Sequence, residues 1–168
     1  GKWKVKVSAG VRSKEYEINV EKCSVSDVQV QVSGDQNPTC GSEVSYTVTI
    51  TGRHRACSDK NRLYAEIYIK GPDGKLVESG SVHSASCSVD SSSGTFSCSR
   101  TVKFKVSQSG KYRFEVKIKM NWPNIEDITP SSVPYAETTI NCQSSQRQCQ
   151  VSNVQISVTP PSQTPTCC

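Results

Sequence analysis

The sequence predicts an all-β protein whose antiparallel sheets pack face to face, and three observations support this. The 168 residues include 20 Val, 9 Ile and 12 Thr but only 2 Leu and 5 Ala, a mixture that suits pleated strands and disfavours helices. Apolar and polar residues alternate with period two along much of the chain. The length is that of one ordinary sandwich with a few dozen residues left over.

An internal repeat organises the chain. Residues 23–32, with the sequence CSVSDVQVQV, recur as CQVSNVQISV at 149–158, and six of these ten positions are identical. The Pro-Thr-Cys of 38–40 recurs at 165–167. The end of the chain therefore repeats the first strand of the unit that begins at residue 23.

The start of the chain repeats the end of the same unit. GKWKVKV at 1–7 resembles GKYRFEV at 110–116. Three segments are therefore expected: 1–22 as the last two strands of a preceding unit, 23–142 as a complete sandwich, and 143–168 as a linker with the first strand of a next unit. The two flanks could equally complete, or be donated to, a neighbouring subunit.

Within the complete unit, the alternation predicts seven short strands joined by turns. They cover 28–32, 44–51, 65–70, 75–78, 101–106, 111–120 and 135–141. The turn Gly-Pro-Asp-Gly at 71–74 precedes the fourth strand. Core positions of the fifth and sixth strands are Val102, Phe104, Val106, Tyr112, Phe114, Val116, Ile118 and Met120. This pattern is typical of two packed antiparallel sheets.

Three segments of the unit carry a family resemblance: SYTVTITG at 45–52, IYIKGPDGK at 67–75 and SGKYRFEV at 109–116. The pattern resembles the immunoglobulin-like repeats of prokaryotic, especially archaeal, extracellular surface and filament proteins, which are similar to fibronectin type III and cell-adhesion-related sandwiches. The resemblance implies an immunoglobulin-like β-sandwich that serves as a building or binding module. It departs from antibody domains, since neither Trp3 nor Trp122 lies in an early central strand.

The nine cysteines indicate disulfide bonds. No Cys-x-x-Cys motif occurs, and His54 and His83 are the only histidines, so the spacings fit no zinc site. Disulfides form and persist in oxidising compartments. We therefore expect an extracellular or cell-surface location.

The sequence alone predicts only part of the disulfide pairing. Cys87 and Cys98 bracket a Ser-rich segment with little to pack it, so we expect them to form a staple across a hairpin. Four further cysteines in the complete unit allow three pairings, which remain open. They are Cys23, Cys40, Cys57 and Cys142.

The cysteines near the end of the chain follow from the repeat. Cys149 and Cys167 occupy the positions of Cys23 and Cys40 and should form equivalent bonds. Cys168 makes the total odd, which leaves at least one thiol unpaired or bonded to another chain.

No residue pattern indicates an enzyme. His54 is expected in a polar loop between two arginines, and His83 in a solvent-facing Ser-rich stretch, so neither is placed as a general base. No carboxylate pair or phosphate-binding loop is found. The acidic residues Asp73 and 126–127 are expected to form turns and not a calcium site. We expect no catalytic residue, no metal and no cofactor.

Basic side chains alternate along the late strands and the first strand. They are Lys103, Lys105, Lys111, Arg113, Lys117 and Lys119, with Lys2, Lys4 and Lys6 at the start. One basic sheet face would attract an anionic partner such as an acidic surface polysaccharide, but lysines on strands also protect edges from aggregation. Nucleic acid is not expected, because Tyr112 and Phe114 should point inward. No run approaches the roughly 20 apolar residues of a membrane span.

The partial units suggest a structural role. A lone strand or hairpin cannot bury its apolar face, so these segments need completion by copies of the chain or by adjacent repeats. The candidate residues for this contact are Val151, Val154, Ile156 and Val158 in the tail and Trp3, Val5 and Val7 at the start. A head-to-tail contact that does not close builds an open filament. The leading hypothesis is a non-enzymatic subunit of an extracellular filament, pilus-like fibre or stalk.

The alternative hypothesis is a carbohydrate- or surface-binding module of a larger adhesin or secreted enzyme. Trp122 and Tyr135 lie in and near the predicted loop 121–128 and could form an aromatic platform for a sugar ring. The competing interpretation is that Trp122 packs over the end of the sandwich.

Overall fold

The computed structural model describes residues 2–19, 21–77 and 82–144. It confirms an all-β fold, in which every pair of strands is antiparallel. The helical content of the described residues is one short 3-10 turn, η1 (Asp59–Asn61). No helix in these ranges is long and apolar enough to cross a bilayer.

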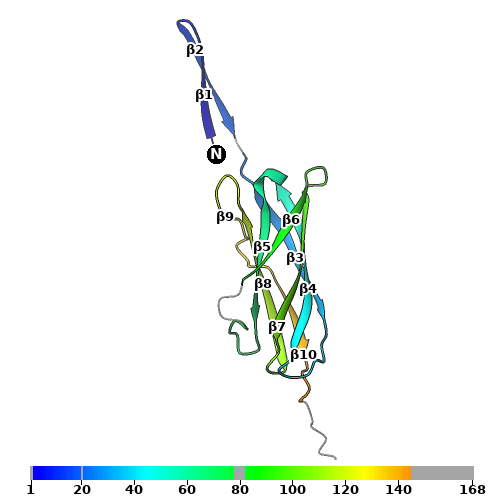
Figure 1. Ribbon diagram of the computed structural model, residues 1–168. Coiled ribbons are helices and arrows are strands. Elements are labelled where there is room, and N and C mark those ends of the chain that lie inside the picture. The colour runs from blue at the N-terminus through cyan, green and yellow to red at the C-terminus, as the bar shows by residue number, and fades with distance from the viewer. Residues whose placement is uncertain (1, 20, 78–81, 145–168) are drawn as a thin grey trace, which may run out of the picture.

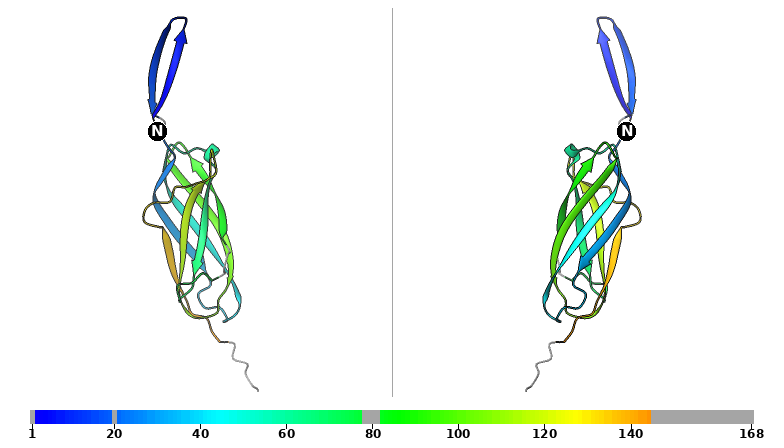
Figure 2. Two further views of the ribbon diagram at one scale, coloured as in Figure 1. Left: turned by 90° about the vertical axis from the view of Figure 1, so that its left-hand side faces the viewer. Right: turned by 90° about the vertical axis from the view of Figure 1, so that its right-hand side faces the viewer.

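The chain begins with a two-stranded hairpin that is separate from the main sheet. Strands β1 (Lys2–Ala9) and β2 (Arg12–Asn19) pair only with each other among the described residues. Their two-residue connection includes Gly10, whose φ of 60° suits a tight hairpin turn. In Figures 1 and 2 the hairpin lies beyond one end of the sandwich.

The remaining strands form the sandwich. They are β3 (Ser24–Gly34), β4 (Glu43–Arg55), β5 (Leu63–Lys70), β6 (His83–Asp90), β7 (Thr95–Lys105), β8 (Gly110–Met120), β9 (Glu126–Asp127) and β10 (Tyr135–Ile140). The long strands follow the order β10-β8-β5-β6-β7-β4-β3, and β9 pairs with β8. The sheet curls until its two edge strands, β10 and β3, contact each other.

Strand β6 turns the corner between the two layers. Its first half, up to Ser86, pairs with β5, and its second half, from Cys87, pairs with β7.

The fourth strand was expected at 75–78, and this was wrong: 71–77 form a turn with one bridge between Lys70 and Leu76. Strand β6 was not predicted, because its alternating residues have small side chains that do not favour a strand strongly.

Other boundaries also differ from expectation. His54 lies within β4, so its expected placement in a loop was wrong. The strand expected from residue 101 begins at Thr95, which shortens the Ser-rich loop to 91–94. Glu126 and Asp127 form β9 and are not simply part of a loop.

The core lies between the two layers, and the expected inward positions of β7 and β8 are all buried. Four aromatic side chains form its centre, with neighbouring ring centroids 5.6–6.0 Å apart. They are Tyr46, Phe104, Tyr112 and Phe114. Strict alternation on strands of opposite layers brings these large rings together.

The chain enters and leaves the sandwich at opposite ends. We call the end near Cys23, where the hairpin joins, the upper end, and the end near Cys142 the lower end (Figure 1). At the lower end, Asn141 N donates to Gln36 O at 2.7 Å, and Cys40 N donates to Gln143 O at 2.8 Å. These bonds close the edge between β3 and β10.

Candidate functional site

The hairpin has one charged and one apolar face. Its register places Lys4 opposite Glu17, and Lys6 opposite Glu15, on one side. On the other side Trp3 lies opposite Ile18, Val5 opposite Tyr16, and Val7 opposite Lys14. Every described residue of the hairpin is exposed, so the apolar face has no cover among the residues that the structure describes.

The matching face of the complete unit is buried. The repeat aligns Trp3 with Tyr112 and Val5 with Phe114. Tyr112 is 1% exposed and Phe114 0%, whereas Trp3 is 65% exposed and Val5 41%. The same sequence pattern is therefore buried in the core of the sandwich and exposed on the hairpin.

The pairing register of the hairpin differs from that of its counterpart. Glu15, Ile18 and Asn19 recur at the same spacing as Glu137, Ile140 and Asn141, so β2 corresponds to β10. In the complete unit Ile140 lies opposite Gly110, whereas Ile18 lies opposite Trp3 and not Gly1. This is a shift of two residues, which keeps each side chain on its face because strands alternate with period two. The tight turn at Gly10 sets the hairpin register, while β8 and β10 are joined by a long connection.

Two strands were expected at 1–22, but the candidate contact residues there were taken from the first strand alone. Tyr16 and Ile18 are 47% and 48% exposed and extend the apolar surface across the hairpin. The signal was present, because these residues alternate with Glu15 and Glu17. The tail candidates Val151, Val154, Ile156 and Val158 lie outside the described residues.

Three disulfides reinforce the sandwich. Cys87 bonds to Cys98 across β6 and β7, the staple expected from the hairpin. The open pairings are resolved as Cys23–Cys57 and Cys40–Cys142. The first joins the start of β3 to the chain just after β4, and the second joins the β3–β4 connection to the chain after β10. Cys149, Cys167 and Cys168 lie outside the described residues.

The two candidate aromatics do not form one platform. Tyr135 pairs with Glu115 in the middle of β8, whereas Trp122 follows the end of β8. The stretch of β8 from Glu115 to Met120 is about 17 Å long at ~3.4 Å per residue. Trp122 is 57% exposed, and the Tyr135 ring is covered on one side by the Arg113 guanidinium at 3.6 Å.

The prediction of one basic face was wrong. Strands β7 and β8 belong to different layers, so Lys103 and Lys117 point outward from opposite sides of the sandwich. Two of the lysines also have acidic partners: Lys119 Nζ lies 2.9 Å from a Glu66 carboxylate oxygen, and Lys111 Nζ lies 3.2 Å from a Glu137 carboxylate oxygen. Sequence alternation shows which residues point outward but not which layer carries each strand.

One of these pairs is part of a small polar network on β5 and β8. Partial burial opposes ionisation of Glu66, but hydrogen bonds from Lys119 and from the Tyr68 hydroxyl outweigh it and lower the pKa of Glu66. The Tyr68 hydroxyl donates to Glu66 at 2.8 Å. Burial and this carboxylate raise the pKa of Tyr68. The network stabilises the charged outer face and offers no free base.

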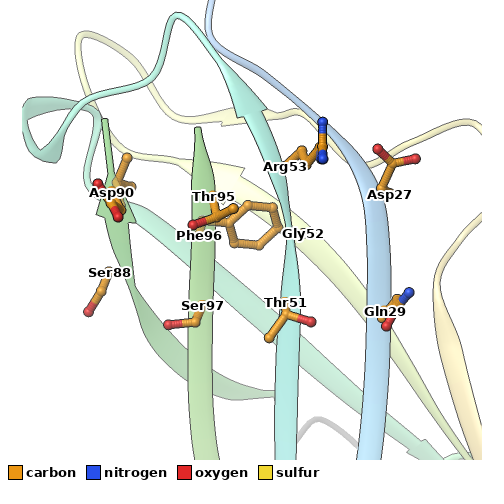
Figure 3. A pocket seen from close by; sticks show the side chains of 11 residues that line it. Asp27, Gln29, Thr51, Gly52, Arg53, Ser88, Asp90, Thr95, Phe96 and Ser97 are labelled. Atoms are coloured by element: carbon orange, nitrogen blue, oxygen red, sulfur yellow. The ribbon is translucent and has the colours of Figure 1, made fainter. Parts of the chain in front are cut away.

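A shallow polar trough lies on the outer face of the other layer (Figure 3). One row of its lining crosses four strands and consists of Gln29, Thr51, Ser97 and Ser88. Next to the Thr51–Ser97 pair of this row, Gly52 lies opposite Phe96. A Cβ atom at Gly52 would approach the Phe96 ring to 2.6 Å. The glycine is required for this close contact. The trough offers hydroxyl and amide groups for hydrogen bonding.

Titratable groups near the trough have structural partners. His54 Nε2 lies 3.0 Å from the Asp90 carbonyl oxygen. The Asp90 carboxylate accepts hydrogen bonds from the hydroxyls of Ser92 and Ser93 and from both backbone amides, which hold the pKa of Asp90 well below its usual range. In the described ranges, no three His, Cys, Asp or Glu side chains gather as a metal site would require.

Comparison with known proteins shows no family and two distant structural similarities. No family model and no curated protein matches the sequence. Among solved structures, the chain resembles the CARDB domain of a Pyrococcus furiosus protein in complex with di-metal ions. The sequence identity is 14%, the match covers 70% of this chain and 88% of that domain, and the TM-score is 0.43. It also resembles AggA, the major subunit of aggregative adherence fimbriae type I from Escherichia coli, with 14% identity, coverage of 72% and 93%, and a TM-score of 0.25.

Both similarities are distant. Sequence identity of 14% and TM-scores below 0.5 do not extend to the binding partners or assemblies of those proteins. Conclusions about function therefore depend on the surfaces of this chain.

Proposed function

We propose that the chain is a non-enzymatic structural subunit of an extracellular filament, pilus-like fibre or surface stalk. Its units join head-to-tail, either by sharing strands between copies or as tandem repeats along one chain. One observation carries the proposal: the apolar face of the hairpin is exposed, although the same face of β8 is buried in the complete unit.

The hairpin needs a specific kind of partner. In the complete unit, Phe114 contacts the rings of Tyr46 on β4 and Phe104 on β7, at centroid distances of 5.6 and 6.0 Å. The equivalent hairpin residue, Val5, therefore calls for a sheet like β3-β4-β7 from another unit. Isolated two-stranded hairpins are marginally stable in water, so the partner also stabilises the hairpin.

The open edges of the hairpin support the same proposal. Each of β1 and β2 pairs on one side only within the described part of the chain. In the complete unit the equivalent of β2 is β10, which lies against β3. The segment 149–158, which repeats the sequence of β3, is the proposed counterpart beside β2 of another copy. A contact between unlike surfaces propagates as an open fibre.

The disulfides support durability and an oxidising location. All six cysteines of the complete unit are bonded. Cross-links of this density are typical of proteins outside the cytoplasm of most organisms. We therefore place the filament outside the cell or on its surface.

Substitution in the hairpin tests this function. Val5→Ser should abolish self-association of the oxidised full chain, measured by analytical ultracentrifugation, because a polar side chain would interrupt the apolar contact. Lys4→Ser is the matched control, since Lys4 precedes Val5 on the charged face and should leave association intact. Unfolding of the sandwich should be unchanged in both variants. Association that survives Val5→Ser would contradict the proposal.

A further inference from the structure

The upper end of the sandwich presents a fixed apolar loop, 121–125. Its side chains Trp122 and Ile125 are 57% and 70% exposed. The base of the loop is anchored, because Asn121 N donates to Asn61 O at 3.0 Å and Asn61 Nδ2 donates to Trp122 O at 3.3 Å. The backbone is therefore held in place while two large apolar side chains remain outside the core.

The lower end carries a small pocket of ≈ 220 Å³ between the turn 71–77 and the connection of β7 to β8. Its lining combines the apolar side chains Pro72, Leu76 and Val77 with the charged side chains Asp73, Lys75 and Lys105. Leu76 is 42% exposed. The pocket thus offers apolar contacts together with two cations and one carboxylate.

The pocket is preformed. Gly71 N donates to Lys75 O, and Gly74 N to Gly71 O, both at 2.9 Å. Pro72 packs so closely on Gly110 that a Cβ at Gly110 would lie 2.7 Å from the proline ring. A ligand entering this pocket would therefore meet little cost of ordering.

An indole ring fits the chemistry of the pocket. Its faces suit apolar walls, and tryptophan is the best aromatic partner for a cation. Neither Lys75 nor Lys105 forms an ion pair within the part of the chain that the structure describes. An incoming ring would meet both ammonium groups beside the Asp73 carboxylate.

The repeat brings the two ends together. By sequence, Gly1 of the hairpin corresponds to Gly110, the residue that contacts Pro72 in the complete unit. The lower end of a preceding unit must therefore face the upper end of this one. From Asn19 to Cys23 the chain spans at most about 14 Å, and Lys22 within this linker pairs with Glu126, next to the apolar loop.

We propose that loop 121–125 of one unit docks into the lower-end pocket of the preceding unit, with Trp122 between Lys75 and Lys105. This contact deepens the proposed function and depends on it, because the occupant is another copy of the same fold. It makes the junction between units a second interface, beside the one at the hairpin. Because the loop and pocket differ, the contact is head-to-tail and sets the direction of the fibre.

Paired substitutions test the contact in the oxidised full chain. Trp122→Ala and Leu76→Ser should each weaken self-association at least tenfold, as truncation of a buried aromatic anchor does. Tyr135→Ala and Val133→Ser are the matched controls, because Tyr135 is 49% exposed and Val133 41%, and neither lies in the loop or the pocket. The double variant should lose less self-association than the product of the two single effects, since Trp122 and Leu76 touch in the proposed contact.

The outcomes separate this contact from the proposed function. If Val5→Ser abolishes association but Trp122→Ala leaves it intact, the contact is overturned and the filament is retained. A wild-type chain that stays monomeric at every concentration would overturn both the contact and the sharing of strands between copies. Loss of binding to an acidic polysaccharide resin in Trp122→Ala, with association intact, would assign the loop to glycan recognition and overturn the contact.

Discussion

Tyr112 connects the core to the lower end through a single hydrogen bond. Its ring is 1% exposed, and its hydroxyl donates to the Gln108 carbonyl at 2.8 Å. Tyr112→Phe should lower the free energy of unfolding by about 1 kcal/mol, because the ring is kept and one hydrogen bond is lost. Urea unfolding would measure this, with the exposed Tyr135→Phe as a control that should change nothing. An unchanged midpoint for Tyr112→Phe would show that the bond is not stabilising.

Asp90 should keep the turn after β6 intact in acid. Hydrogen bonds from Ser92 and Ser93 depress the pKa of Asp90. A depressed carboxyl pKa stabilises the folded state above the unfolded value of about 3.9, and this is lost as the pH falls through the lower folded pKa. NMR titration should find Asp90 ionised well below the usual range, and Ser93→Ala should raise its pKa. Ordinary titration in the wild type would contradict this.

Single residues were predictable where local alternation decides their position. The inward side chains of β7 and β8 follow from the sequence, since a strand must place every second residue on one face. Contacts across strands were not predictable. A Cβ at Gly34 would approach the Tyr46 ring of the next strand to 2.6 Å, a contact that depends on pairing register and leaves no local signal.

At the scale of elements, the three disulfides should contribute unequally. They close separations of 102, 34 and 11 residues, for Cys40–Cys142, Cys23–Cys57 and Cys87–Cys98. Loop-closure entropy gives about 5, 4 and 3 kcal/mol in that order. Replacing each pair with alanines and measuring urea midpoints tests the order. A loss for Cys87–Cys98 as large as that for Cys40–Cys142 would contradict the entropic explanation.

Strand β6 shows why one element was missed. Its inward positions Ala85, Cys87 and Val89 alternate correctly, but small side chains and serines lack the β-branched content that marks a strand. Long-range pairing with β5 and β7 forms it instead. By contrast, the turn at 71–74 was identified by its Pro and Gly residues.

At the scale of the molecule, the repeat predicted partial units at both ends of the chain, and the structure shows an exposed apolar face on the hairpin. The exposed face of the hairpin was expected from Trp3, Val5 and Val7. The two ends of the sandwich were not, because the lower pocket combines the turn 71–77 with residues of β7 and β8 that are distant in sequence. Only the folded chain brings these groups together.

Electron microscopy of the native protein, isolated without reductant, would show whether the chain assembles into filaments. Head-to-tail assembly predicts long filaments with an axial repeat on the order of 40 Å, from the 11 residues of β8 at strand spacing. Isolated single particles of one sandwich, with the hairpin uncovered, would contradict it.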